Sequence, residues 1–285
     1  MENKNTSYTL VLSGLSDLPS LQLPLFLVFL LVYLMTLTGN LLIVLLICTD
    51  SHLQTPMFFF LGTLACLDMS YSSVTTPQML FDFNTQIRFI SIQACITQIY
   101  FFVLFAMSEI SLLAVMSYDR YVAICRPLHY TQIMHWKACV LLVLGVLIFS
   151  VLYPLLLLVS CSDTFINVLL ILILAIFPGG GVFVLTFCPY IIILNTIMKM
   201  SKAMRSKAFS TCSSHLTVVF IFYGTALFSY FHPKAKDNSA VDRVAPVFYT
   251  VLTPLFNPLI YSLRNKKIKL SLKRALCRLK SSFTS

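Results

Sequence analysis

Charged residues are scarce in this sequence. Only 11% of its 285 residues are charged, whereas 58% are hydrophobic. A soluble domain averages about 25% charged residues, because it needs them to cover its surface. The sequence also lacks internal repeats, low-complexity tracts and any polar stretch long enough for a soluble domain. These deficits exclude an ordinary soluble globular protein.

Long stretches of the chain contain no charged side chain, or a single acid. A membrane-spanning helix needs about 20 mostly apolar residues. Strands of a membrane β-barrel would instead alternate in polarity, which the run Leu25–Ile47 does not. The sequence therefore predicts seven membrane-spanning helices. Their approximate ranges are 24–47, 57–80, 92–124, 139–158, 166–197, 213–232 and 243–262.

The predicted fold is an all-α membrane protein with one seven-helix domain over residues 1–285. Of the 20 Lys and Arg residues, fifteen lie on the side of the C-terminal tail, and positively charged loops stay in the cytoplasm. We therefore expect an extracellular segment at 1–23, the bundle at 24–262 and a cytoplasmic tail at 263–285. Asn5 begins an N-glycosylation acceptor, Asn-Thr-Ser, on the external side. The net charge of +10 indicates topology and contact with anionic lipids, with no case for nucleic acid.

Two carboxylates interrupt the apolar spans. Asp68 lies about midway along the second predicted span, and Glu109 about midway along the third. Ionisable groups inside a bilayer are costly, so each is a candidate functional group. Two carboxylates at similar depth can share a cation, since hard cations prefer oxygen ligands. Alternatively, one or both are protonated and hydrogen-bonded to Asn40 or Asn257, and position alone leaves both interpretations open.

A long motif stands at the cytoplasmic end of the third predicted span. The run Met116–Tyr130 reads MSYDRYVAICRPLHY. It closely resembles the MAYDRYVAIC-x-PLHY signature of vertebrate olfactory receptors, a branch of the rhodopsin-like G-protein-coupled receptors. Further segments resemble the same family in the same order, and they are Gly39–Asn40, Leu53–Leu61, Lys207–Leu216 and Pro254–Asn265. The chain is thereby identified as a member of this family.

The resemblance implies a switch at the cytoplasmic face. Asp119 and Arg120, followed by Tyr121, would form the ionic pair that keeps this face closed in the resting receptor. On activation Arg120 would release Asp119, the sixth helix would swing outward, and a helix of a heterotrimeric G protein would enter. Such a two-state element is biased by a ligand bound on the other side. Taken alone, Asp-Arg-Tyr also fits an interfacial charge pair whose arginine reaches water.

A second motif near the chain's end belongs to the same scheme. In Asn257-Pro258-x-x-Tyr261, proline removes a backbone hydrogen bond and bends the helix. Asn257 and Tyr261 would offer polar contacts toward Asp68 and Arg120. Tyr190 on the fifth span is a candidate partner in the active arrangement. His215, at the inner end of the sixth span, is as compatible with a structural role as with a functional one.

By resemblance, the ligand pocket lies in the outer half, between the third, fifth, sixth and seventh helices. The candidate ligand-binding residues are Phe102, Val103, Ala106, Met107, Tyr223, Ala226, Leu227, Tyr230 and Thr250. The first four share one helical face. An apolar lining with a few hydroxyls suits a small volatile molecule, and the lack of charge disfavours a ligand anchored by a salt bridge. Ordinary helix packing explains each position equally well.

The chain departs from its family around the fourth and fifth spans. Cys95 matches the family's half-cystine, but the long second external loop that should hold its partner is shortened by roughly 25 residues, as judged from the family pattern. Cys161 remains as a candidate partner, although sequence cannot establish the distance between the two. Pro178–Gly181, a Pro-Gly-Gly-Gly run, is expected to bend or break the fifth helix.

The function predicted from the resemblance is that of an odorant receptor in the cell membrane. It would bind a small, mostly apolar odorant and activate a stimulatory G protein, which raises cyclic AMP through adenylate cyclase. Alternatives are a truncated, poorly folding relative that does not signal, and a small transporter. The sequence holds no nucleophile–base pair, metal-ligand cluster or phosphate-binding glycine loop. It therefore predicts no enzyme and no cofactor, apart from the candidate sodium ion.

After Asn265 the tail alternates basic and apolar residues over 266–280. This pattern is typical of an amphipathic helix lying on the inner leaflet, with the basic side chains toward anionic lipid headgroups.

Overall fold

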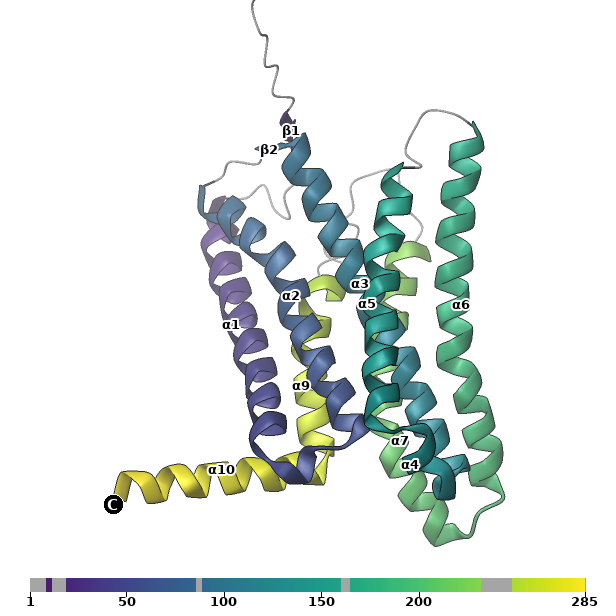
Figure 1. Ribbon diagram of the computed structural model, residues 1–285. Helices are drawn as coiled ribbons and strands as arrows, with labels where there is room; N and C mark the ends of the chain where they lie inside the picture. Colours follow the sequence, from purple (N-terminus) through teal and green to yellow (C-terminus); the bar gives the residue numbers. More distant parts are fainter. Residues whose placement is uncertain (1–8, 12–18, 86–88, 160–164, 232–247, 285) are drawn as a thin grey trace, which may run out of the picture.

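Long helices running side by side make up most of the molecule (Figure 1). The structure is a computed structural model and describes residues 9–11, 19–85, 89–159, 165–231 and 248–284. Within these ranges the long elements of the bundle are α1 (Pro19–Thr49), α2 (Pro56–Thr85), α3 (Ile92–Cys125), α5 (Trp136–Val159), α6 (Phe165–Met198), α7 (Lys202–Phe231), and a π-helical turn, η3 (Phe248–Leu252), that continues into α9 (Thr253–Arg264).

Each predicted span falls on one of these segments. Among the described residues, five helices are long and apolar enough to cross a membrane, and α7 adds the shorter apolar segment Cys212–Thr225. The apolar segment of α7 begins at Cys212, beside the predicted start of the sixth span at 213, whereas the helix itself begins earlier, at Lys202. Its first turns are basic and polar. Basic side chains can be solvated beyond the membrane without disfavouring a helix.

At Pro178–Gly181, where a bend or break was expected, the break is wrong and the bend stays a prediction. The helix α6 runs from Phe165 to Met198 without interruption. Lipid offers no hydrogen-bond partner to a free backbone N–H or C=O group, so each such group left unpaired costs several kcal/mol. The weaker helix propensity of glycine, about 1 kcal/mol per residue, cannot outweigh that.

Local sequence explains where several helices begin. Proline stands first in α1 and α2, at Pro19 and Pro56, where its missing N–H is one that a helix leaves unpaired anyway. Ser91 caps α3, since its hydroxyl accepts a hydrogen bond from the Ala94 amide at 3.2 Å.

Two short strands at one end of the bundle were not predicted. The strand β1 (Thr9–Val11) pairs antiparallel with β2 (Phe89–Ser91), so that Leu10 lies opposite Ile90. The β-branched and aromatic residues of both strands favour this pairing. It ties the N-terminal segment to the residues just before α3.

The helix α3 lies at the centre of the packing. It contacts α2, α5, α6 and α7, while α1 packs against α2 and α9. The interior is filled by large apolar side chains such as Phe60, Leu112 and Phe222. Outward faces of α1, α5 and α6 carry exposed leucines and isoleucines, for example Leu31 and Leu141. An apolar belt of this kind is expected where the surroundings are lipid chains.

The cytoplasmic end holds the short elements η1 (Ser51–Leu53), η2 (Pro127–His129) and α4 (Tyr130–Ile133), together with α10 (Lys266–Thr284). The helix α10 extends sideways from the base of the bundle (Figure 1). Arg274 of α10 forms an ion pair with Asp50, with N and O 2.8 Å apart. A hydrogen bond from Ser271 is the largest cause that lowers the pKa of the Asp50 carboxyl, and Arg274 contributes in the same direction.

Candidate functional site

The cytoplasmic end of α3 carries a buried ion pair. Arg120 donates to the Asp119 carboxylate through Nε, at 3.0 Å, and through Nη2. Asp119 is 1% exposed and Arg120 7%. A buried arginine must be paired, because removing its partner leaves an uncompensated charge. The pair therefore holds Arg120 against α3 and keeps its guanidinium from the cytoplasm.

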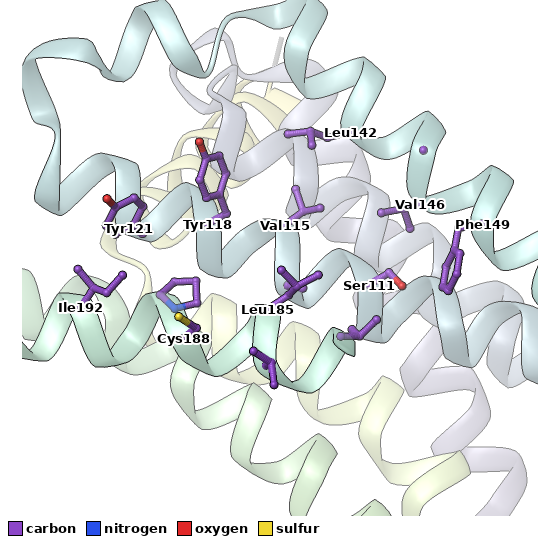
Figure 2. Close-up of a pocket in the computed structure, with 15 residues that line it drawn as sticks. Ser111, Val115, Tyr118, Tyr121, Leu142, Val146, Phe149, Leu185, Cys188 and Ile192 are labelled. Atoms are coloured by element: carbon purple, nitrogen blue, oxygen red, sulfur yellow. The ribbon is translucent and has the colours of Figure 1, made fainter. Parts of the chain in front are cut away.

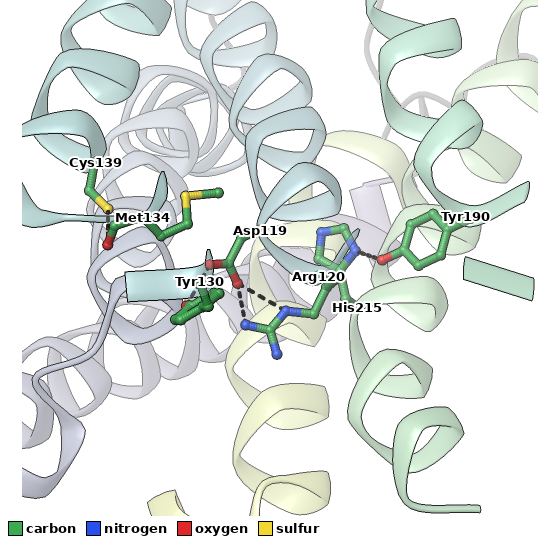
Figure 3. A network of polar contacts seen from close by, with 7 residues as sticks. All are labelled: Asp119, Arg120, Tyr130, Met134, Cys139, Tyr190 and His215. Atoms are coloured by element: carbon green, nitrogen blue, oxygen red, sulfur yellow. Dashed lines mark hydrogen bonds and ion pairs between the residues drawn. The ribbon is translucent and has the colours of Figure 1, made fainter. Parts of the chain in front are cut away.

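A third side chain completes this network (Figure 3). Tyr130, at the start of α4, donates its hydroxyl to Asp119 at 2.8 Å. Partial burial is the main cause that raises the pKa of Tyr130, and the negative charge of Asp119 acts in the same direction. The hydroxyl therefore keeps its proton at neutral pH and remains a donor. Asp119 is thus held by Arg120 of its own helix and by Tyr130 of α4.

A second contact joins the inner ends of the fifth and sixth membrane helices, α6 and α7. Tyr190 of α6 and His215 of α7 share a hydrogen bond between the phenol hydroxyl and Nδ1 (Figure 3). Both side chains are buried, and Tyr190 packs in an apolar cluster that includes Ile193 and Tyr121. The Tyr190–His215 contact joins α6 to α7, and the apolar cluster links both helices to α3.

The two intramembrane carboxylates lie together in the core. Asp68 is 0% exposed and Glu109 1%, and the two groups are close enough to interact. Asn257 donates to both oxygens of Asp68, at 2.9 and 3.0 Å. Both oxygens of Glu109 have no hydrogen-bond partner among the described residues. The four carboxylate oxygens of this buried site form a donor set that suits a hard cation.

Asn40, named as an alternative partner for these carboxylates, bonds elsewhere. Its amide donates to the backbone carbonyl groups of Thr36, at 3.0 Å, and Pro254, at 3.1 Å. It thereby joins α1 to α9. Gly39 lies beside Pro258, and a Cβ built on Gly39 would stand 3.4 Å from the proline ring. The neighbouring motif residue Tyr261 is 1% exposed, and its hydroxyl has no partner among the described residues.

The predicted ligand-binding residues fall into three groups. Phe102, Val103, Ala106 and Met107 of α3 are half-buried or buried, and the Phe102 ring contacts that of Tyr71 with centroids 5.2 Å apart. Tyr223 lies against Thr186, with their hydroxyl oxygens 3.2 Å apart. Thr250 is half-buried in η3.

The remaining members of that set are less enclosed or not described. Leu227 is 48% exposed on α7, so the described structure does not place it in an interior pocket. The side chains of Ala226 and Tyr230 lie outside the described part of the chain.

Comparisons with known proteins agree with the family resemblance found in the sequence motifs. A family model described as "Olfactory receptor" matches residues 29–160 and 151–279. The chain is 44% identical to human Olfactory receptor 8G1, and the alignment covers 97% of this chain and 98% of that relative. It is 43% identical to human Olfactory receptor 5B12, covering 99% and 98%. The chain belongs to the olfactory receptor family.

The fold of the receptor is also that of a known structure. Squid rhodopsin matches with a TM-score of 0.77 at 18% identity, over 94% of this chain and 88% of that one. This likeness establishes the seven-helix fold. Olfactory receptors are non-enzymatic, multi-pass proteins of the cell membrane, which confirms those sequence predictions.

The comparisons bear on the shortened loop of the receptor as well. The alignments to the two relatives extend over 305 and 309 residues, more than the 285 of this chain. The two matches to the family model meet at residues 151–160, where the missing segment was inferred. Cys161 and Asn5 lie outside the described residues. Cys95 forms no disulfide with any other described cysteine, so its pairing stays a prediction.

One cavity of the receptor stands apart from every predicted site residue except Tyr121. It has a volume of about 650 Å³ and is lined by residues of α3, α5 and α6 (Figure 2). Its lining from α3 includes Ser111 and Tyr118, and that from α5 includes Gly145.

Sequence reasoning left three contacts of the receptor unassigned. Tyr130 lies inside the motif quoted above, but a motif does not show which side chain meets Asp119. Tyr190 and His215 were both singled out, yet nothing in their spacing pairs them with each other. Thr186, beside Tyr223, carried no signal that distinguishes it from other threonines in the spans.

Proposed function

We propose that the receptor binds a small, mostly apolar odorant in the outer half of the bundle and activates a stimulatory heterotrimeric G protein. Cyclic AMP would then rise through adenylate cyclase. The observation that carries this proposal is the buried Arg120, paired with Asp119 at the cytoplasmic end of α3. A G protein can engage this surface once the pair separates, which makes it a two-state element that a ligand can bias.

The surroundings of Tyr223 support an apolar ligand. The Tyr223 ring lies among Phe183 and Phe187, with centroids 5.3 Å away in each case. Its hydroxyl and that of Thr186 supply polar groups within an otherwise apolar surrounding. An apolar site with a few placed hydroxyls suits a neutral molecule with one polar group.

A cell assay with a cyclic AMP reporter tests this proposal. Cells would express the receptor with an N-terminal epitope and a stimulatory G protein, and a panel of volatile molecules would be applied. Ala106→Phe fills the proposed site and should raise the half-maximal odorant concentration at least about fivefold, as expected from overpacking of about 1–3 kcal/mol. Ile99→Phe, on an exposed face of α3, is the matched control. Equal responses from both variants would refute the outer-half site.

A sodium ion is proposed as an allosteric cation between Asp68 and Glu109. The support is the pair of buried carboxylates and the two unpartnered Glu109 oxygens. Asp68 and Glu109 would hold the ion, while Asn257 orients Asp68 through its two hydrogen bonds. Two carboxylates so close together in a buried site require a cation or a proton to offset their repulsion.

Anionic lipids of the inner leaflet are the proposed partner of α10. Ile268 and Ser271 are buried toward the bundle, whereas Lys266, Lys267 and Lys269 are exposed. Clusters of Lys and Arg beside a membrane span attract anionic headgroups.

A folding-impaired relative is the second candidate function, and the shortened loop favours it. Surface labelling of the N-terminal epitope would compare the native chain with a version carrying a family-length second external loop. Equal surface levels would support the working receptor, and surface display of the restored version alone would support the impaired one. Membership of the olfactory receptor family leaves the transporter hypothesis without support.

A further inference from the structure

A groove runs between three helices on the lipid-facing side of the receptor. The helix α3 forms its floor with Ala114, Tyr118 and neighbouring residues spaced along one helical face. The helices α5 and α6 form its walls; both pack on α3, while the described parts of α5 and α6 have little direct contact with each other. The groove opens toward lipid beside Val184 and Leu185, which are 60% and 64% exposed.

Gly145 makes room for this cavity. A Cβ built on Gly145 would meet no atom within 4 Å, so a side chain there would project into open space. The resulting volume of about 650 Å³ falls within the range of about 300–1,000 Å³ typical of small-molecule sites. No charged residue is among those that line it.

One polar group in the groove is unsatisfied. Three serines of α3 are buried, and two of them, Ser108 and Ser117, donate to the carbonyl oxygen four residues earlier at 2.9 Å. The third, Ser111, is 8% exposed, and its hydroxyl has no hydrogen-bond partner in the part of the chain that the structure describes. Figure 2 shows this hydroxyl on the side of the groove toward Phe149. An unpaired hydroxyl in an apolar setting is costly, so a ligand oxygen placed there would be stabilised.

The depth of Ser111 selects the kind of ligand. It lies fourteen residues before the end of the 34-residue helix α3 and is therefore near the middle of that helix. A helix of this length is about 51 Å long and extends beyond both sides of a hydrocarbon layer about 30 Å thick, so its middle lies deep in the layer. The polar group of a phospholipid or a sterol is held at the membrane surface and does not reach this depth. A neutral molecule that dissolves in the bilayer can carry its oxygen there.

We propose that this groove is a second small-molecule site, which takes a neutral, mostly apolar ligand with one carbonyl oxygen from the bilayer. The Ser111 hydroxyl donates to that oxygen, and the aliphatic part fills the space beside Gly145. The site is separate from the outer-half site and does not depend on G-protein coupling. Its ligand shares the chemical class of an odorant but enters from the lipid.

Photolabelling of the full receptor in phosphatidylcholine nanodiscs tests the site. The probe is a medium-chain aliphatic ketone carrying a diazirine, with the matching diazirine alkane and a diazirine phospholipid as comparisons. We expect the ketone to label the segments of α5 and α6 around Gly145 and Cys188, and excess unlabelled ketone to suppress that labelling. Labelling by the phospholipid that is equally strong and equally suppressed would overturn the inference.

Two variants locate the ligand. Ser111→Ala should lower ketone labelling about fivefold, the effect of one net hydrogen bond, and leave alkane labelling unchanged. Gly145→Phe should reduce labelling by both probes to background, whereas Gly145→Ala should not. Ser111→Ala changes little volume, so it decides the question even if Gly145→Phe fails to fold.

A third variant separates this site from the proposed odorant site. Ala106→Phe should leave groove labelling intact whatever it does to signalling. Loss of groove labelling in Ala106→Phe, or ketone labelling that Ser111→Ala leaves unchanged, would overturn the second site.

Discussion

The two buried polar centres of the receptor are built on opposite principles. At the cytoplasmic end, the Asp119 carboxylate accepts hydrogen bonds from Arg120 and Tyr130, and Arg120 offsets its charge. We call these three residues the matched centre. In the middle of the bundle, the carboxyl groups of Asp68 and Glu109 lie together, and Asn257 donates hydrogen bonds to Asp68 but not to Glu109. We call this pair the unmatched centre. Under the proposed function, the Asp119–Arg120 pair of the matched centre must separate before the receptor can signal. The unmatched centre is stable only with a cation or proton, which makes it a place where an ion can act.

The largest effect on signalling is expected from removing Arg120, the cation of the matched centre. Arg120→Ala should abolish odorant-stimulated cyclic AMP while surface labelling persists, because the residue that would meet the G protein is gone. Arg126→Ala, an exposed arginine in the loop just after α3, is the control and should signal normally. Unchanged signalling by Arg120→Ala would mean that the pair is structural alone.

The unmatched centre should respond to sodium. Replacing external sodium with choline should shift the odorant potency of the native receptor at least about fivefold, the lower range of an allosteric coupling. Glu109→Gln should abolish that shift, since it removes the anionic charge of the unpartnered oxygens. Asp82→Asn, near the outer end of α2, should retain it. A sodium response that survives Glu109→Gln would favour a protonated pair.

Loosening the matched centre should have a smaller effect than removing it. Tyr130→Phe deletes one hydrogen bond to Asp119, worth about 1 kcal/mol. Basal cyclic AMP should rise about fivefold at equal surface level. Tyr118→Phe, an exposed tyrosine of α3, should leave it unchanged. A fall in basal signalling in Tyr130→Phe would show that Tyr130 supports the active arrangement instead.

The smallest effect is expected for an ion pair outside the membrane. Asp50→Asn removes the pair with Arg274, yet exposed pairs contribute little, so surface level should change less than about twofold. The lowered pKa of Asp50 means that its contribution is complete above the ordinary aspartate range and is lost as pH falls through the lowered value. Proteolysis of α10 in inside-out vesicles should therefore be constant between pH 6 and pH 8. Proteolysis that varies across this interval would assign the titration to another group.

Sequence reasoning was most successful where one physical requirement acts alone. Uncharged runs of sufficient length identified the spans, since lipid excludes charge whatever the neighbouring helices do. At Pro178–Gly181 the expected break was wrong, because an interrupted helix would leave backbone groups unpaired in lipid. The start of α7 at Lys202 could not be predicted from apolar length, because that length marks the membrane span and not the whole helix.

The sequence by itself determined the number of spans, their orientation and the residues able to form the switch and the carboxylate pair. The tertiary structure decided which partners they take: Tyr130 for Asp119, His215 for Tyr190, and Asn257 for Asp68 while Asn40 turns to Pro254. The open groove beside Gly145 and the unpaired Ser111 likewise emerge from packing. Burial in lipid depends on composition along the chain, whereas a hydrogen bond depends on how helices far apart in sequence approach, within a few tenths of an ångström.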